Sequence, residues 1–105
     1  MNIIDLKNRT AIVTGGARGI GFAIAKRMVE SGAAVVVWDI DADALDKAVA
    51  ALKNDGRVHS AIVDVTDETA IARGVETCIR DLGKIDILVN NAGIAGGKLF
   101  ALCVT

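Results

Sequence analysis

The sequence predicts a doubly wound α/β layer built on a parallel sheet. Short β-branched runs alternate with amphipathic helical stripes along the whole chain, and each stripe ends near a glycine. The chain contains no internal repeat, no low-complexity segment and no proline. With 105 residues, of which 52% are hydrophobic and 24% charged, it is expected to form one compact unit around its own core.

Four strands are expected where apolar residues run almost without interruption. They cover residues 10–14, 34–38, 60–64 and 85–90. Runs of this kind are typical of parallel strands that are covered on both faces. Because a helix separates each pair, right-handed crossovers are expected, and the predicted sheet ends after the fourth strand.

The first expected helix follows the glycine-rich segment after the first strand. It begins near Gly19 and ends at Gly32, which suits the residue that follows a helix. Ile20, Ile24 and Met28 recur at a spacing of four residues. This stripe predicts the face that packs on the sheet.

The second and third expected helices carry similar signals at their ends. Asp41 is the candidate N-cap of the second, which ends before Gly56. Thr66 is the candidate N-cap of the third, which ends at Gly83. Each has one apolar face to place on the sheet.

Composition excludes several classes of protein. The net charge of -1, from 12 basic and 13 acidic residues, argues against binding to nucleic acid or an anionic membrane surface. The longest uncharged run, residues 87–97, is shorter than the roughly 18 to 20 residues of a membrane span, so a soluble, cytoplasmic protein is expected. Cys78 and Cys103 lack the spacing of a metal or redox motif, and we expect no metal site.

The first strand leads into a glycine-rich turn, residues 14–21, with the pattern T-G-x-x-x-G-x-G. Glycines allow a sharp turn and a close approach of the main chain, and the helix that follows offers free N–H groups to a diphosphate. A tight bend without a ligand is the alternative, but the spacing and the strand–turn–helix context favour a dinucleotide site. The candidate cofactor-binding residues of this turn are Gly15, Arg18, Gly19, Ile20 and Gly21. Arg18 is either a phosphate ligand or only solvated.

Asp39 ends the second strand, 24 residues after Gly15. A carboxylate at this place accepts hydrogen bonds from the ribose hydroxyls of an adenosine. The alternative, that an acidic residue only favours the start of the next helix, is accepted for Asp41 and Asp43.

Two further segments follow the third and fourth strands. Asp64 and Val65 come after the third, and an Asn-Asn-Ala-Gly sequence, residues 90–93, comes after the fourth. In open α/β sheets ligands bind beyond the carboxyl ends of the strands, so these segments are expected to meet the glycine turn in one crevice. A polar pair that merely ends a strand is the alternative for the two asparagines. The candidate site residues here are Asp64, Val65, Asn91, Ala92 and Gly93.

The glycine pattern and the Asn-Asn-Ala-Gly sequence together resemble the short-chain dehydrogenase/reductase family, over residues 7 to about 95. The resemblance implies a Rossmann-type fold and hydride transfer between a nicotinamide cofactor and a small alcohol or carbonyl substrate. It also implies that the glycines wrap the pyrophosphate, that Asp64 and Val65 border the adenine, and that Asn90 and its neighbours line the nicotinamide side. Since Asp39 would repel a 2′-phosphate, NAD is expected in preference to NADP.

The family's catalytic Ser and Tyr-x-x-x-Lys group is missing. The sequence has no Tyr, and its only serines, Ser31 and Ser60, precede the Asn-Asn-Ala-Gly sequence. We therefore assign no catalytic residue and expect the chain to be inactive by itself. Residues 1–95 are interpreted as a dinucleotide-binding half-domain and residues 96–105 as an atypical apolar tail. A shortened protein, a shifted reading frame and an incomplete chain would all account for that tail.

Two other functions fit parts of this pattern. One is a non-catalytic module that binds a dinucleotide and contacts a partner. The other is an adenosylmethionine-dependent methyltransferase, which the Asn-Asn-Ala-Gly sequence and the glycine spacing disfavour. Because the fourth expected strand, residues 85–90, would lie at the edge of the sheet, we also expect a homo-oligomer joined along that strand.

Overall fold

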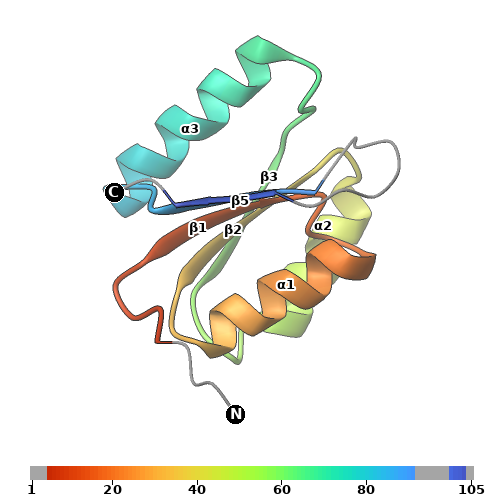
Figure 1. The fold of residues 1–105 in the computed structure, drawn as a ribbon. Coiled ribbons are helices and arrows are strands. Elements are labelled where there is room, and N and C mark those ends of the chain that lie inside the picture. The colour runs from red at the N-terminus through yellow and green to blue at the C-terminus, as the bar shows by residue number, and fades with distance from the viewer. Residues whose placement is uncertain (1–4, 92–99, 104–105) are drawn as a thin grey trace.

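The computed structural model describes residues 5–91 and the backbone of residues 100–103. Strands and helices alternate up to the fourth strand, and a fifth strand follows (Figure 1). The elements are β1 (Thr10–Thr14), α1 (Gly19–Glu30), β2 (Ala34–Asp39), α2 (Ala42–Leu52), β3 (Val58–Ile62), α3 (Glu68–Leu82), β4 (Ile87–Asn90) and β5 (Phe100–Cys103).

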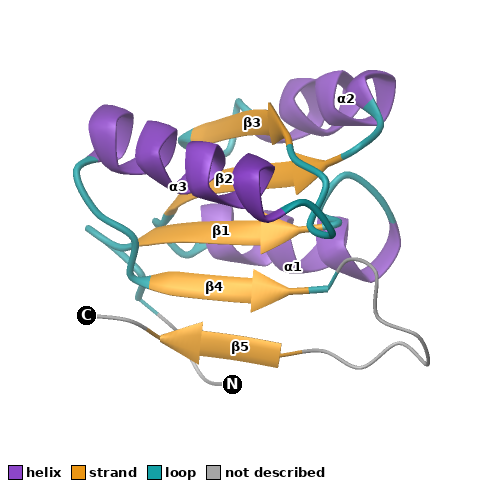
Figure 2. Cartoon of the chain, turned by 90° about the horizontal axis from the view of Figure 1, so that it is seen from above, coloured by secondary structure: helices purple, strands orange, loops and turns teal. Residues whose placement is uncertain are grey.

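The strands form one sheet with the order β3-β2-β1-β4-β5. The first four are parallel, which confirms the predicted fold class. β5 runs antiparallel to β4 and pairs with each of its four residues (Figure 2). The prediction that the fourth strand is the edge of the sheet is therefore wrong, because Phe100–Cys103 forms a strand beside it.

Helices cover both faces of the sheet. α1 and α2 lie on one face and α3 on the other (Figure 1). Since side chains alternate along a strand, Val13, Val35 and Val37 pack toward α1 and α2, whereas Ile12 and Trp38 pack toward α3. Every residue of β1 and β2 is buried, as expected for the central strands of a parallel sheet.

β3 differs from its prediction in both position and burial. It covers Val58–Ile62 instead of residues 60–64, and no residue of the strand is fully buried. Ile62 is 65% exposed. Within the described part of the sheet β3 pairs only with β2, so a strand expected to be covered on both faces lies at the edge.

The start of β4 also differs from its prediction. It begins at Ile87 instead of residue 85. Asp86 precedes the strand, and its carboxylate accepts a hydrogen bond of 2.8 Å from the N–H of Thr10. The carboxylate also pairs with Lys84 at 3.0 Å and Arg9 at 3.6 Å. These bonds fix where β1 and β4 begin to pair.

The buried face of α1 lies one residue beyond the predicted stripe. Gly21, Ala25 and Val29 are buried, whereas Ile20 is 65% exposed and Ile24 is only half-buried. Small side chains let the helix axis approach the sheet closely, which turns the larger isoleucines to the flank. Periodicity therefore found the helix, and Ile24 and Met28 of the predicted stripe pack against the edge of the core, whereas Ile20 does not.

The helix ends follow local hydrogen bonding. Asp41 caps α2, as predicted, by accepting from the N–H of Ala44 at 3.1 Å. Asp67 caps α3 in place of the predicted Thr66, and accepts from two main-chain N–H groups. Gly83 ends α3 with φ of 85°, as expected for a glycine after a helix.

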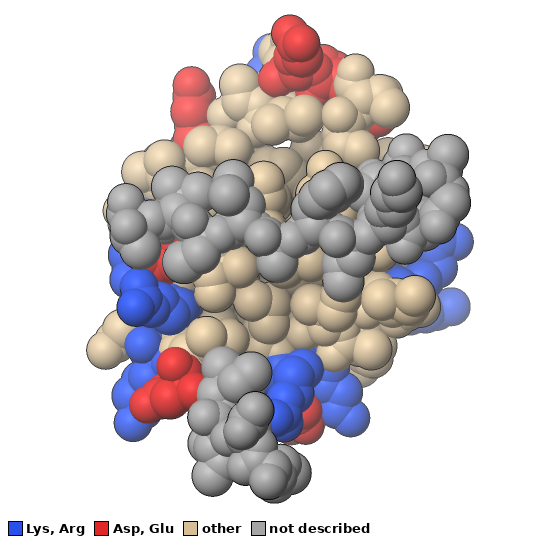
Figure 3. Space-filling model, viewed as in Figure 1, with Lys and Arg blue, Asp and Glu red and all other residues tan. Residues whose placement is uncertain are grey.

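The surface carries charges of both signs. On the face shown in Figure 3, basic and acidic side chains both occur around the rim, without one extended basic area. Within residues 5–91 and 100–103, no helix combines the length and the apolar character that crossing a membrane requires.

Candidate functional site

The glycine turn connects β1 to α1 and folds over the end of β2. Gly15 and Gly19 have φ of 63° and 60°, a backbone region that favours glycine. The N–H of Gly15 donates to the carbonyl of Trp38 at 2.7 Å. The turn is thereby held against the carboxyl end of β2, where Asp39 follows.

Gly21 lies where α1 passes closest to this turn. A Cβ atom at Gly21 would stand 2.2 Å from the carbonyl oxygen of Gly15 and 2.8 Å from Nδ2 of Asn91. A Cβ atom at Gly19 would meet no atom within 4 Å. Close packing therefore requires glycine at position 21, whereas Gly19 lies beside open space.

The first turn of α1 is open to an anion. Arg18, at the N-cap, makes no capping hydrogen bond with its side chain, and the first turn contains no acidic residue. The N–H groups at the start of a helix have no partners within the helix and carry its positive dipole end. This is the arrangement that binds phosphate groups at helix N-termini.

A cavity of about 410 Å³ lies beside this turn, at the carboxyl ends of the parallel strands. Five of its lining residues were predicted from the sequence, namely Gly15, Arg18, Asp39, Asp64 and Val65. Three were missed, namely Ile40, Val63 and Thr66. The missed residues are sequence neighbours of predicted ones, and only the loop conformation shows that they face the same space.

Asp39 is held rigidly at the edge of this cavity. Its side chain is 7% exposed, and Oδ1 accepts from the N–H groups of Ile40 at 2.8 Å and Asp41 at 3.2 Å. Nη2 of Arg18 lies 3.9 Å from the same oxygen. Within the described part of the chain, Oδ2 has no hydrogen-bond partner, so it is available to a hydroxyl donor.

Asp64 is an exposed carboxylate with a local partner. The hydroxyl of Thr66 donates to Oδ1 at 2.6 Å, and the N–H of Thr66 donates to the same atom at 2.9 Å. Hydrogen bonds from the Thr66 hydroxyl and main chain lower the pKa of Asp64 below its usual value. Asp64 is therefore ionised at neutral pH, and Thr66 orders its carboxylate instead of capping α3.

Thr14 links the glycine turn to the end of β4. Its hydroxyl donates to Oδ1 of Asn90 at 3.0 Å and accepts from the N–H of Asn91 at 2.8 Å. Nδ2 of Asn91 in turn donates to the carbonyl of Gly15 at 3.5 Å. Asn91 therefore contacts the glycine turn, but it does not line the cavity around Asp39. Ala92 and Gly93 lie outside the described residues.

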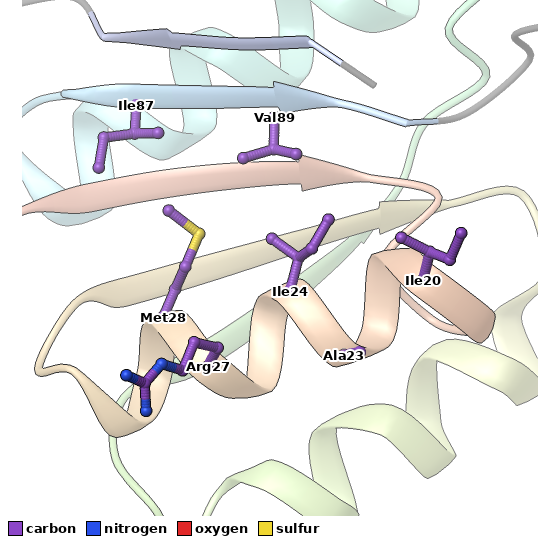
Figure 4. Close-up of a pocket in the computed structure, with 7 residues that line it drawn as sticks. All are labelled: Ile20, Ala23, Ile24, Arg27, Met28, Ile87 and Val89. Atoms are coloured by element: carbon purple, nitrogen blue, oxygen red, sulfur yellow. The ribbon is translucent and has the colours of Figure 1, made fainter. Parts of the chain in front are cut away.

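Ile20 does not line the cavity. It borders an apolar groove of about 440 Å³ between α1 and β4, with Ile24, Met28, Ile87 and Val89 (Figure 4). The structure therefore separates Ile20 from the predicted site residues around Asp39.

The arrangement fits the adenosine and diphosphate portion of a dinucleotide. It offers an uncapped helix N-terminus for phosphate, a buried carboxylate for ribose hydroxyls, and an apolar wall at Ile40, Val63 and Val65 for a base. Close packing at Gly21 keeps the helix N-terminus near the glycine turn.

Comparison with known proteins identifies similar sequences and folds. The family model for short chain dehydrogenases matches residues 9–103. The chain is 40% identical over 98 residues to a 3alpha-hydroxysteroid dehydrogenase from Mediterraneibacter gnavus, a match that covers 90% of this chain and 39% of that protein.

Solved structures show the same family resemblance. A 7 alpha-hydroxysteroid dehydrogenase complexed with NADH and 7-oxo glycochenodeoxycholic acid matches with a TM-score of 0.85 and 39% identity, over 91% of this chain and 39% of that one. The RhlG/NADP active-site complex of Pseudomonas aeruginosa matches with a TM-score of 0.81 and 35% identity, over 90% and 39%. The chain thus spans about 39% of the length of these relatives.

Proposed function

The chain belongs to the short-chain dehydrogenase family, and on that premise we propose that its cavity binds the adenosine half of NAD. The observation that carries the proposal is the buried carboxylate of Asp39, which borders the cavity together with Gly15 of the turn. One oxygen of Asp39 is anchored by main-chain N–H groups, and the other is left for a ribose hydroxyl. The uncapped start of α1 supplies donors for the diphosphate.

The bound nicotinamide would supply a hydride donor or acceptor for the interconversion of an alcohol and a carbonyl compound. The residues of this chain would bind and orient the cofactor. Thr14 and Asn91 would support this by tying the end of β4 to the glycine turn. The substrate is proposed as a small alcohol or carbonyl compound acted on by a longer parent enzyme.

We propose a preference for NAD over NADP. A 2′-phosphate near Asp39 would place like charges roughly 4 Å apart, which costs up to about 4 kcal/mol at an effective dielectric constant of 20. Nη2 of Arg18, at 3.9 Å from Asp39, offsets only part of this because its side chain is 67% exposed. Discrimination of roughly tenfold or more follows.

Isothermal titration calorimetry with NADH and NADPH tests this preference. The wild-type chain is expected to bind NADH more tightly, and Asp39→Ala is expected to remove or reverse the difference. Asp43→Ala, which removes an exposed carboxylate from the first turn of α2, is the matched control and should leave the ratio unchanged. Tighter binding of NADPH by the wild type would contradict the assignment of Asp39.

We also propose that these 105 residues do not catalyse hydride transfer by themselves. The sequence contains no Tyr, and the family's acid/base group requires one. Loss of a positioned acid/base typically costs about 10² to 10⁴ in rate. NADH formation from a panel of alcohols is expected to be absent, and any activity that persists in Gly15→Trp comes from a contaminant. Activity that Gly15→Trp abolishes would contradict the proposal.

A second proposal is a non-catalytic module that binds a dinucleotide and contacts a partner, because, within the described residues, the features of the cavity that suit a dinucleotide include no catalytic group. The two functions predict coding sequences that differ after codon 105. A transcript that continues into a Tyr-x-x-x-Lys segment supports the enzyme, and one that stops at codon 105 supports the module. The expected self-association remains a prediction, which sedimentation of the purified chain tests.

A further inference from the structure

Arg18 is shared between two carboxylates. Nη2 lies 3.9 Å from Oδ1 of Asp39, and Nη1 lies 3.9 Å from Oδ2 of Asp41. The Asp39 side chain is 7% exposed, whereas those of Asp41 and Arg18 are 43% and 67% exposed. The guanidinium therefore lies between a buried acid at the end of β2 and a more exposed acid at the start of α2.

Only one carboxylate oxygen of Asp41 takes part in the helix cap. Oδ1 accepts from the N–H of Ala44 at 3.1 Å and so caps α2. Oδ2 is the atom that faces Arg18. The negative charge of Asp41 thus lies beside the guanidinium while the cap is kept.

We propose that Asp41 is a specificity-determining residue that disfavours a phosphate on the 2′ position of the bound adenosine. This inference rests on the proposed cofactor site. The group formed by Asp39, Asp41 and Arg18 carries a formal charge of -1, and Asp64 adds a further negative charge to the same cavity. Asp41 adds negative charge beside the cavity and pairs with Arg18, the one basic residue that lines the cavity in the described part of the chain. Without that charge, Arg18 and Asp39 balance, and Arg18 is freer to pair with a 2′-phosphate.

The substitution Asp41→Asn isolates the charge. Asn caps helices about as well as Asp, so α2 should keep its N-terminus. The matched control is Asp43→Asn, which removes one exposed charge from the first turn of the same helix. Within the described residues, Asp43 forms no ion pair with Arg18.

The probes are adenosine 2′,5′-bisphosphate and 5′-AMP, which differ only by the 2′-phosphate, and their binding is measured by calorimetry. Asp41→Asn is expected to increase the affinity for the bisphosphate roughly three- to tenfold and to change the affinity for 5′-AMP by less than about twofold. Asp43→Asn should change both by less than about twofold. In an Arg18→Gln background, the effect of Asp41→Asn on bisphosphate binding should become smaller, because only the direct repulsion between Asp41 and the 2′-phosphate is left.

Two results would overturn the inference. One is an unchanged affinity of Asp41→Asn for the bisphosphate, and the other is a gain of equal size with and without Arg18. If the wild type binds neither nucleotide, the proposed function fails, and the ion pair is then judged by NMR. The ¹H–¹⁵N heteronuclear NOE of the Arg18 Nε–H group should fall in Asp41→Asn and stay unchanged in Asp43→Asn. An equal NOE in both variants would also overturn the inference.

Discussion

Replacing Gly21 by Ala should destabilise the site by steric crowding alone. The added Cβ would stand 2.2 Å from the carbonyl oxygen of Gly15, about 1 Å inside ordinary van der Waals contact. That oxygen belongs to the main chain, and the N–H of Gly15 is bonded to Trp38 at 2.7 Å, so a side-chain rotation cannot relieve the contact. The start of α1 must therefore move away from the turn.

The loss of stability expected for Gly21→Ala follows from two opposing effects. Overpacking of this kind costs about 1 to 3 kcal/mol, and a backbone contact belongs at the upper end. Replacing Gly by Ala inside a helix stabilises the helix by about 1 kcal/mol. The net loss is about 2 kcal/mol, which lowers the melting temperature of a domain of this size by about 10 °C. Dinucleotide binding should weaken as well, because the helix N-terminus shifts.

Gly19 provides the matched comparison. Its φ of 60° disfavours Ala, but its Cβ would meet nothing within 4 Å. Asn tolerates this backbone region better than Ala does, so Gly19→Asn should be more stable than Gly19→Ala. At position 21 a larger side chain should increase the clash with Gly15, so the Gly21→Asn variant should be less stable than the Gly21→Ala variant. Thermal unfolding followed by circular dichroism measures all four variants. A Gly21→Ala melting temperature at or above that of the wild type would refute the reasoning.

Two further predictions concern the packing under α3 and the junction before β4. In Gly74→Ala the new Cβ would lie 2.7 Å from Cζ2 of Trp38, so overpacking of about 1 to 3 kcal/mol should exceed the helix gain of about 1 kcal/mol. Thermal unfolding should show a lower melting temperature, and adding Trp38→Phe should restore part of it because this clash is with a side chain. The Thr10 N–H and the Lys84 ammonium lower the pKa of Asp86, so its stabilising effect is complete above about pH 4 and is lost as pH falls through the lowered pKa. Urea unfolding should therefore show that Asp86→Asn is less stable than the wild type at pH 7, with a smaller difference at pH 3; an equal difference at both values would contradict this.

The features that the sequence determined are those with local causes. Alternating strands and helices follow from hydrophobic periodicity, and the Asp41 cap follows from a hydrogen bond that spans three residues. The glycine turn and the acid at the end of β2 follow from their spacing along the chain. These signals therefore predicted the fold class and most of the residues around the cavity.

The features that only the tertiary structure decided depend on how distant elements are placed. Thr14 meets Asn91 across 77 residues of sequence, and the rotation of α1 about its axis decided that Gly21 is buried and Ile20 is exposed. The pairing of β5 with β4 also required the sheet register. Arg18 meets both Asp39 and Asp41 because the loops after β1 and β2 end at the same edge of the sheet. A sequence pattern identifies the residue types, but the distance between two side chains is fixed only when the elements that carry them are packed together.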